Sequence, residues 1–249
     1  MTIYITGDIH ASHDIRKLGK KHFAPKGLTR DDYLIILGDF GLVWCDPPSK
    51  EEAYWLQWLE DQPWTTLFID GNHENHVLLN SFPTEQWHGG AIHRIREHVL
   101  HLMRGEVFEL GGCSFFTMGG DYSSDVEWRT PGKSWWEEEV PNESERAHAI
   151  SSLEQHNWKV DYVLTHCPPP QALYDILDFR DHMLVVKDEY TEWLQNIANQ
   201  LDFKRWFYGH MHVDFPYVEP FTALYNDIVK LLPDGHVQKV LHYMDRKWA

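Results

Sequence analysis

Five short segments of this chain combine carboxylate, imidazole and carboxamide side chains at close spacing. Oxygen atoms and imidazole nitrogens are the ligands that manganese, iron(II) and zinc accept in proteins. One such segment would be weak evidence, but five in one chain predict a centre that binds metal ions. The segments lie at residues 7–10, 38–39, 71–74, 165–166 and 209–212.

The spacing within two of these segments limits how the chain can run. Asp8 and His10 are two residues apart, and in an extended chain they would point to opposite faces. The chain must therefore turn there if both side chains bind one ion, and Gly7 permits such a turn. His210 and His212 have the same spacing, which lets neighbouring imidazoles serve two different ions.

An apolar run typical of a β-strand precedes each segment. A hydrophobic strand that ends in polar residues is how an α/β sheet builds a site at its carboxyl edge. A short helix is expected at 14–21 and an amphipathic helix at 50–61, so the first third predicts a parallel βαβαβ sheet. The apolar runs lie at residues 3–5, 33–37, 67–69, 162–164 and 206–208.

The middle of the chain has a different pattern. Short apolar runs between 91 and 119, with glycines at the turns, predict an antiparallel meander. Residues 119–141 crowd glycine, proline, aromatic and charged side chains without a period, which indicates a long functional loop near the site. Asn142, with Glu145 three residues later, resembles a capping box and predicts a helix to about residue 156.

The last third returns to alternating strands and helices. Strands are expected at 160–165 and 204–208, with a helix at about 188–200 between them. The three prolines at 168–170 predict that no helix begins directly after the first of these strands. Short β-like runs continue through 213–243.

The composition bounds the class of protein. A chain of 249 residues with 43% hydrophobic and 24% charged residues is typical of a globular protein, and we expect one domain over 1–249. A net charge of −16 disfavours extended nucleic acid as a partner, although bound cations could still attract a phosphorylated substrate. No apolar run approaches the ~18 residues of a membrane span, and we expect no signal peptide. Three scattered cysteines favour buried thiols in a reducing cytoplasm.

With these motifs in order, the chain resembles the calcineurin-like metallophosphoesterase family. The resemblance is to small bacterial or phage-type members that carry a similar Trp-Trp-Glu segment, here at residues 135–137. The resemblance implies a four-layer α/β/β/α sandwich, in which two mixed sheets are flanked by helices. It also places the active site at the carboxyl ends of the central strands.

The resemblance further implies two divalent metal ions, with manganese or iron favoured and zinc accepted. A hydroxide bridging the two metals would attack phosphorus directly, without a covalent enzyme intermediate. Asp39 would bridge the metals, and His73 would protonate or stabilise the leaving oxygen rather than bind a metal. The implied ligands are Asp8, His10, Asp39 and His212 for one ion, and Asp39, Asn72, His166 and His210 for the other.

The second segment departs from the protein serine/threonine phosphatases of this family. Leu42 stands where their histidine-orienting aspartate would lie, and no arginine follows. His73 then needs another orienting group, and Asp46, Glu74 and Asp121 are the candidates. The 119–141 loop offers substrate anchors, although its aromatic residues could equally serve packing or dimer contacts. The candidate anchors are the cations Arg129 and Lys133 and the aromatic residues Trp128 and Tyr122.

We therefore expect metal-dependent hydrolysis of a phosphate ester. A phosphatase acting on a small molecule or nucleotide is favoured, and a phosphodiesterase or nuclease is the alternative. A non-catalytic scaffold of the same fold is disfavoured, because such proteins lose ligands that this chain keeps. The oligomeric state is open.

Overall fold

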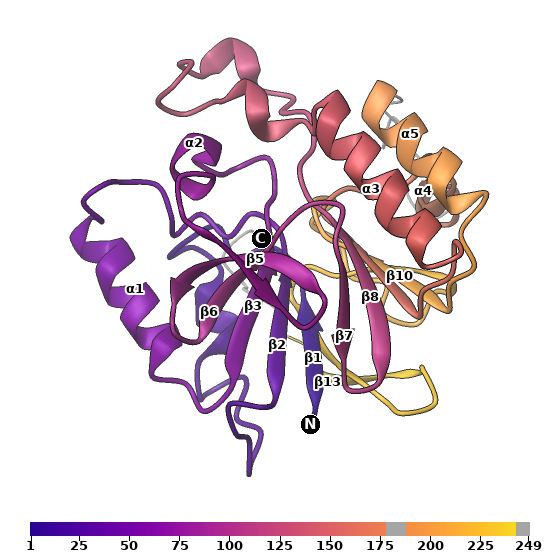
Figure 1. Ribbon diagram of the computed structural model, residues 1–249. Coiled ribbons are helices and arrows are strands. Elements are labelled where there is room, and N and C mark those ends of the chain that lie inside the picture. Colours follow the sequence, from indigo (N-terminus) through magenta and orange to yellow (C-terminus); the bar gives the residue numbers. More distant parts are fainter. Residues whose placement is uncertain (178–187, 243–249) are drawn as a thin grey trace.

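The computed structural model describes residues 1–177 and 188–242 and forms a sandwich of two mixed β-sheets with helices on both outer faces (Figure 1). The four-layer architecture implied by the resemblance is thereby confirmed. The larger sheet has the order β13 (Val237–His242), β12 (Asp227–Leu231), β1 (Ile3–Thr6), β2 (Tyr33–Leu37), β3 (Thr65–Ile69), β6 (Val99–Leu102), β5 (Gly90–Arg96), β4 (Thr84–Trp87). The smaller sheet has the order β11 (Phe221–Ala223), β10 (Arg205–Tyr208), β9 (Tyr162–Thr165), β8 (Cys113–Met118), β7 (Val107–Leu110).

Helices cover the outer face of each sheet. On the larger sheet these are the short 3-10 helix η1 (Ile15–Leu18) and α1 (Lys50–Glu60), which begins in a capping box at Ser49. On the smaller sheet they are α3 (Glu143–Gln155), α4 (Pro170–Leu177) and α5 (Glu189–Ala198). The capping box predicted at Asn142 is confirmed. A single turn, α2 (His76–Leu79), follows β3.

The central strands are largely apolar because they are buried between the opposite sheet and the outer helices. All five residues of β2 are buried, because one face packs against the smaller sheet and the other against the helices. Ile35 and Leu37 of this strand share a cluster with Leu164 and Phe207 of the opposite sheet. Strands buried on both faces read as continuous apolar runs, which is why the sequence located them well.

The predicted meander between 91 and 119 is wrong. The chain forms two hairpins that lie in different sheets, with β5 and β6 in the larger sheet and β7 and β8 in the smaller. β6 also pairs in parallel with β3 and is buried along its whole length. Both its edges are therefore occupied, and β7 can pair only in the other sheet. The strand β4 was not predicted, because its TEQW sequence is mostly exposed and polar.

Two local expectations also need correction. The expected stop at 168–170 does not occur, because α4 begins at Pro170. Proline suits the first helical position, where its missing N–H has no partner to lose. The cysteines are not uniformly buried: Cys167 is buried, Cys113 is half-buried and Cys45 is exposed. Within the described part of the chain, no helix has both the length and the apolarity to cross a membrane.

A buried lysine links the N-terminal strand of the larger sheet to the segment that precedes its C-terminal hairpin. Lys17 of η1 is fully buried, and its ammonium group donates to the carbonyl oxygens of Gly7 at 3.0 Å and Asp8 at 2.8 Å. It also donates to the carbonyl oxygen of Tyr225, which precedes β12. The ammonium therefore holds the end of β1 against the C-terminal hairpin of the same sheet.

Replacing Lys17 by methionine should destabilise the protein by about 2–4 kcal/mol, because two buried carbonyl groups and one half-buried one would lose a charged donor. Urea denaturation of the metal-free proteins would measure the change without interference from metal binding. The exposed neighbour Lys20 provides the control, since Lys20→Met should leave the midpoint nearly unchanged. Equal midpoints for the two variants would contradict this role for Lys17.

Candidate metal centre

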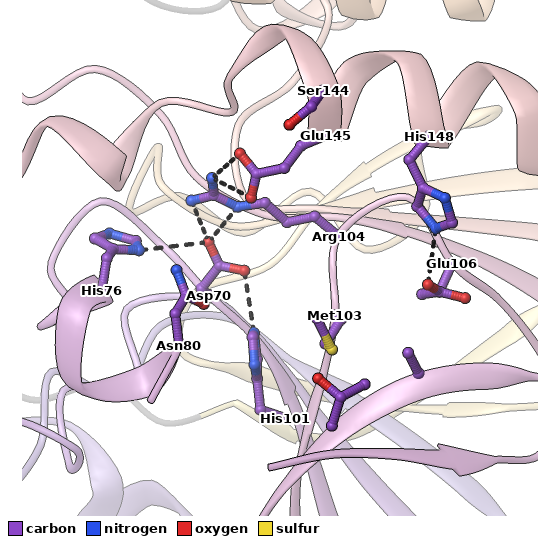
Figure 2. Close-up of a pocket in the computed structure, with 12 residues that line it drawn as sticks. Asp70, His76, Asn80, His101, Met103, Arg104, Glu106, Ser144, Glu145 and His148 are labelled. Atoms are coloured by element: carbon purple, nitrogen blue, oxygen red, sulfur yellow. Dashed lines mark hydrogen bonds and ion pairs between the residues drawn. The ribbon is translucent and has the colours of Figure 1, made fainter. Parts of the chain in front are cut away.

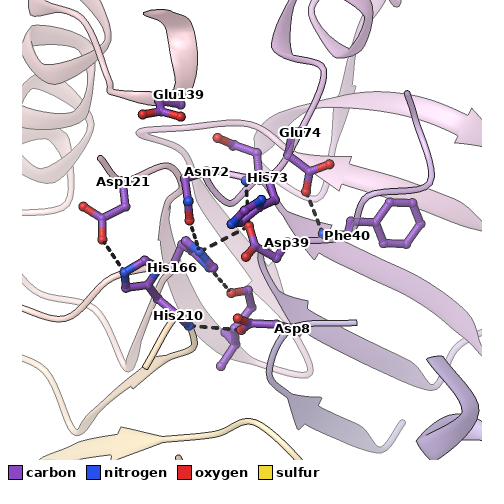
Figure 3. Close-up of polar contacts among 12 residues, drawn as sticks. Asp8, Asp39, Phe40, Asn72, His73, Glu74, Asp121, Glu139, His166 and His210 are labelled. Carbon is purple, nitrogen blue, oxygen red and sulfur yellow. Dashed lines mark hydrogen bonds and ion pairs between the residues drawn. The ribbon is translucent and has the colours of Figure 1, made fainter. Parts of the chain in front are cut away.

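The polar segments converge at the carboxyl ends of β1, β2, β3, β9 and β10 (Figure 3). In one half of the centre, donor atoms of four predicted ligands all lie within 4.8 Å of one another. His10 Nε2 is 3.1 Å from Asp39 Oδ2, and His212 Nε2 is 3.2 Å from Asp8 Oδ2. This half brings together Asp8, His10, Asp39 and His212.

The other half lies on the far side of Asp39. His166 Nε2 is 3.4 Å from Asp39 Oδ1 and 3.0 Å from Asn72 Oδ1. Asp39 thus turns one carboxylate oxygen toward each half, as a bridging ligand would. The ring of His210 meets that of His166 edge to face at 5.0 Å, and its Nε2 is 3.2 Å from Asp121 Oδ2.

Partners outside the centre orient two of the imidazoles. The Nδ1 atom of His10 is 2.8 Å from the carboxylate of Asp14, and the Nδ1 atom of His166 is 2.8 Å from the carbonyl oxygen of Leu37. When Nδ1 carries the proton and donates it outward, Nε2 presents a lone pair to the centre. Such outer partners fix the tautomer of metal-binding histidines.

Backbone amides hold the two buried carboxylates. Asp8 Oδ1 accepts from the N–H of His210 at 3.0 Å, and Asp39 Oδ1 accepts from the N–H of His73 at 2.8 Å. A Cβ atom on Gly209 would lie 2.3 Å from Asp8 Oδ1, and one on Gly71 would lie 2.1 Å from Asp39 Oδ1. Glycine is therefore required at both positions so that a ligand can approach the backbone closely. Asp39 comes from the neighbouring strand β2, whereas Asp8 follows β1 of the opposite sheet.

The turn that joins Asp8 to His10 is made differently from our expectation. Gly7 is not left-handed; its role is close packing, because a Cβ there would lie 2.0 Å from the carbonyl oxygen of Leu224. The left-handed residues are His10 and Ala11, with φ of 40° and 53°. Such conformations are strained for residues other than glycine and cluster at functional sites.

The two buried carboxylates of the centre require nearby positive charge to remain ionised. Asp8 and Asp39 are 0% and 1% exposed, and this burial raises the pKa of both carboxyls. The charge of Asp39 raises the pKa of Asp8 further. The surrounding imidazoles outweigh both effects and hold the pKa of each carboxyl below its usual value. Burial lowers the pKa of His10, but the carboxylates of Asp14, Asp39 and Asp8 raise it to about 10.

These residues fit a pair of divalent cations. Asp8 Oδ2 is buried and, among the described residues, accepts no hydrogen bond of good geometry. Carboxylate, carboxamide and imidazole donors together are the set that manganese, iron and zinc accept. The Asp8 half alone offers two carboxylates and two imidazoles. A metal ion would coordinate this oxygen and offset the two buried negative charges.

None of the three candidate orienting groups forms a hydrogen bond or ion pair with the His73 side chain within the described residues. The carboxylate of Glu74 is buried and accepts from the backbone N–H groups of Phe40 and Gly41, at 2.6 and 3.0 Å. Asp121 contacts His210 instead, and Asp46 is exposed. The neighbour of His73 is Arg129, whose Nη2 atom lies 2.7 Å from Nδ1 and 3.0 Å from Nε2.

The 119–141 loop carries Arg129 to this position. The guanidinium group is held by the carboxylate of Asp125 at 2.7 Å and by the carbonyl oxygen of Ser134 at 3.3 Å. Two other predicted anchors are exposed to solvent: Trp128 is 88% exposed, and Lys133 is also exposed.

The remaining aromatic residues of the loop divide between a cavity and the core. Tyr122 borders a cavity of about 440 Å³ that reaches Asp121 and His210. Trp136 is buried and packs edge to face against Trp44 at 5.1 Å, which is a structural role. The loop thus places Arg129 beside His73 and Tyr122 at the cavity that His210 also lines.

Sequence reasoning overlooked Asp121 as a neighbour of the ligands. A signal was present, because the apolar strand β8 is followed by Gly119, Gly120 and Asp121. This is the same strand–glycine–carboxylate pattern that the first two segments show at Asp8 and Asp39. β8 pairs in parallel with β9, so both strands end at the same edge of the smaller sheet.

A second buried polar cluster lies beside the centre (Figure 2). Asp70, which follows β3, accepts from Arg104 Nε at 2.8 Å and Nη2 at 2.6 Å, and its other oxygen is 3.1 Å from His101 Nε2. Arg104 lies between Asp70 and Glu145, beside a cavity of about 360 Å³. Burial and then the charge of Arg104 lower the pKa of His76, also in this cluster, to about 3.

Residues 1–214 match the calcineurin-like phosphoesterase family, and the match spans every predicted ligand from Asp8 to His212. No curated protein matches the chain. Among solved structures, a phosphopantetheinyl hydrolase from Mycobacterium tuberculosis is similar, with 16% sequence identity and a TM-score of 0.47. That comparison covers 100% of this chain and 98% of the other.

The lowered pKa of His76 should make stability depend on pH. An unfolded histidine titrates near 6.5, so between pH 6.5 and 3 the unfolded state binds more protons and stability falls as pH falls. Between pH 7.5 and 5, the metal-free parent should lose about 2 kcal/mol more than His76→Phe. Urea denaturation across this range measures the difference, and parallel curves would contradict the assignment.

Proposed function

This chain belongs to the calcineurin-like phosphoesterase family of metal-dependent hydrolases, and from that premise we propose that it is a phosphatase acting on a phosphorylated small molecule or nucleotide. We further propose that manganese or iron fills both halves of the centre. The observation that carries the choice of a monoester is the contact between Arg129 and His73. It sets a guanidinium group beside the proposed acid, where the dianionic phosphate of a monoester would bind.

The residues of this chain would divide the chemistry as follows. Bound divalent ions would activate the attacking water and neutralise the phosphate. Arg129 would form paired hydrogen bonds to non-bridging phosphate oxygens, for which a planar guanidinium is suited. Burial and then the charge of Arg129 lower the pKa of His73, although Asp39 opposes them. An anionic phosphate bound next to both side chains would raise that pKa and favour proton donation to the leaving oxygen.

The cavity of about 440 Å³ supports a substrate of limited size. His210 lies in its lining, together with the apolar side chains of Leu173 and Met211 and the aromatic ring of Tyr122. An apolar wall with an aromatic side chain suits a small organic group or a base rather than a polymer. The net charge of −16 also disfavours a long polyanionic substrate.

Hydrolysis of para-nitrophenyl phosphate, compared with bis-para-nitrophenyl phosphate in manganese, tests the proposal. We expect metal-dependent turnover with a preference for the monoester. His73→Ala should lower kcat about 10²–10⁴-fold, because proton transfer to the leaving group is lost. Arg129→Ala should lower kcat/KM about 10–100-fold. Arg129→Lys should recover only part of this loss, because an ammonium group lacks the paired N–H donors of a planar guanidinium.

Lys133→Ala serves as the comparison within the same loop. Its side chain is exposed, so Lys133→Ala should lower kcat/KM less than Arg129→Ala does. An equal loss would mean that the net charge of the loop is important rather than the placement of Arg129 beside His73. A preference for the diester would contradict the phosphatase assignment and favour a phosphodiesterase. No turnover of either compound at full metal occupancy would contradict an enzymatic function.

A further inference from the structure

The carboxamide of Asn72 can bind a metal ion only through its oxygen. The amide group is nearly symmetric in shape, so its hydrogen-bond partners decide which atom faces the centre. Here Oδ1 lies 3.0 Å from His166 Nε2, and Nδ2 donates to the hydroxyl oxygen of Ser123 at 3.0 Å. The orientation of this ligand therefore depends on Ser123 accepting a hydrogen bond.

Ser123 is in turn held by Glu139. The Ser123 N–H donates to Oε1 at 2.7 Å, and its hydroxyl donates to Oε2 at 2.7 Å. Both residues are buried, with exposures of 8% and 1%. An ionised carboxylate only accepts, so the single hydroxyl hydrogen of Ser123 is committed to Glu139. The lone pairs that remain can only accept, and the group of Asn72 that meets them must be the NH₂.

The position of Glu139 is itself fixed from the strand that carries Asn72. Its carbonyl oxygen accepts from Arg104 Nη2 at 3.2 Å, and that guanidinium group is bound to Asp70. Asp70 is two residues before Asn72, so the contacts close into a ring that begins and ends at the end of β3. Every member contributes through hydrogen bonds between buried groups.

We propose that Ser123 and Glu139 are positioning residues that orient the Asn72 carboxamide and thereby set the affinity of the second metal site. The proposal rests on the dinuclear centre of the proposed function. Neither residue lies in the segments that carry the predicted ligands; both come from the 119–141 loop. The loop would thus complete a metal site that the sheets alone leave without a defined amide orientation.

Titration of the metal-free protein with Mn²⁺ by calorimetry tests the proposal without relying on activity. The parent should bind two ions, and Asn72→Ala identifies the event that belongs to the second site. Ser123→Ala should weaken that same event about 10–100-fold, as loss of outer-shell partners does. The Mn²⁺ affinity of the site that contains Asp8 should change less than about threefold, well below that range. The exposed neighbour Ser124→Ala is the matched control and should bind like the parent.

Glu139→Gln tests the direction of the hydrogen bonds rather than packing. The Ser123 N–H must donate, so the glutamine oxygen would face it and the glutamine NH₂ would face the hydroxyl. The hydroxyl hydrogen would then turn toward the Asn72 NH₂, and the two donors would repel each other. This nearly isosteric change should also weaken the second event, whereas a packing role would leave it unchanged.

The failures of this proposal and of the proposed function can be told apart. A parent that does not bind two Mn²⁺ ions would overturn the dinuclear centre itself. Parent-like binding of both ions by Ser123→Ala and Glu139→Gln would overturn only the positioning role. Equal weakening of both events would do the same, because it would indicate general loss of structure. If Ser123→Ala is unfolded by circular dichroism, Ser123→Thr keeps the hydroxyl and should restore the second event, and failure to do so would count against the proposal.

Discussion

Two carboxylates buried side by side are the constraint around which this molecule is organised. Asp8 and Asp39 sit at the ends of neighbouring strands, where burial and mutual repulsion both oppose their charges. A buried charge is tolerated only when it is paired and hydrogen-bonded. The fold supplies backbone N–H groups from His73 and His210, and the same segments bring the imidazoles. Divalent cations would complete this neutralisation. The same two buried carboxylates would therefore both bind the metals and determine the stability of this edge of the sheet.

That arrangement constrains the backbone around it. His10, Asp39, His210 and His212 all have positive φ, between 40° and 57°. Each such residue is held in a conformation that costs of order 1–3 kcal/mol when it is not glycine. The strands below are buried on both faces and can support these turns. A rigid double sheet is therefore a requirement for the geometry of the centre.

Sequence reasoning placed the predicted ligand residues at one edge because each of them closely follows a buried strand. For those residues, periodicity and strand direction were enough to place them at one edge. Ser123 and Glu139 could not be placed from the sequence, because the loop between them has no hydrophobic periodicity. The path of the loop also depends on Arg104, which lies outside both the loop and the ligand segments. The two hairpins after residue 90 were also beyond local reasoning. Which sheet a hairpin joins depends on which strand edges are already occupied, and β6 has none free.

The way the 119–141 loop is anchored has a consequence for how this protein could diverge. Its two ends are pinned, since Ser123 meets Asn72 and Glu139 closes the ring to Arg104. The stretch between them carries the largely exposed Trp128. Mutations at the ends of the loop would weaken metal binding. Mutations in the middle, Arg129 excepted, would instead alter which substrates the site accepts. Substrate range could therefore change over evolutionary time while the catalytic metals stay in place.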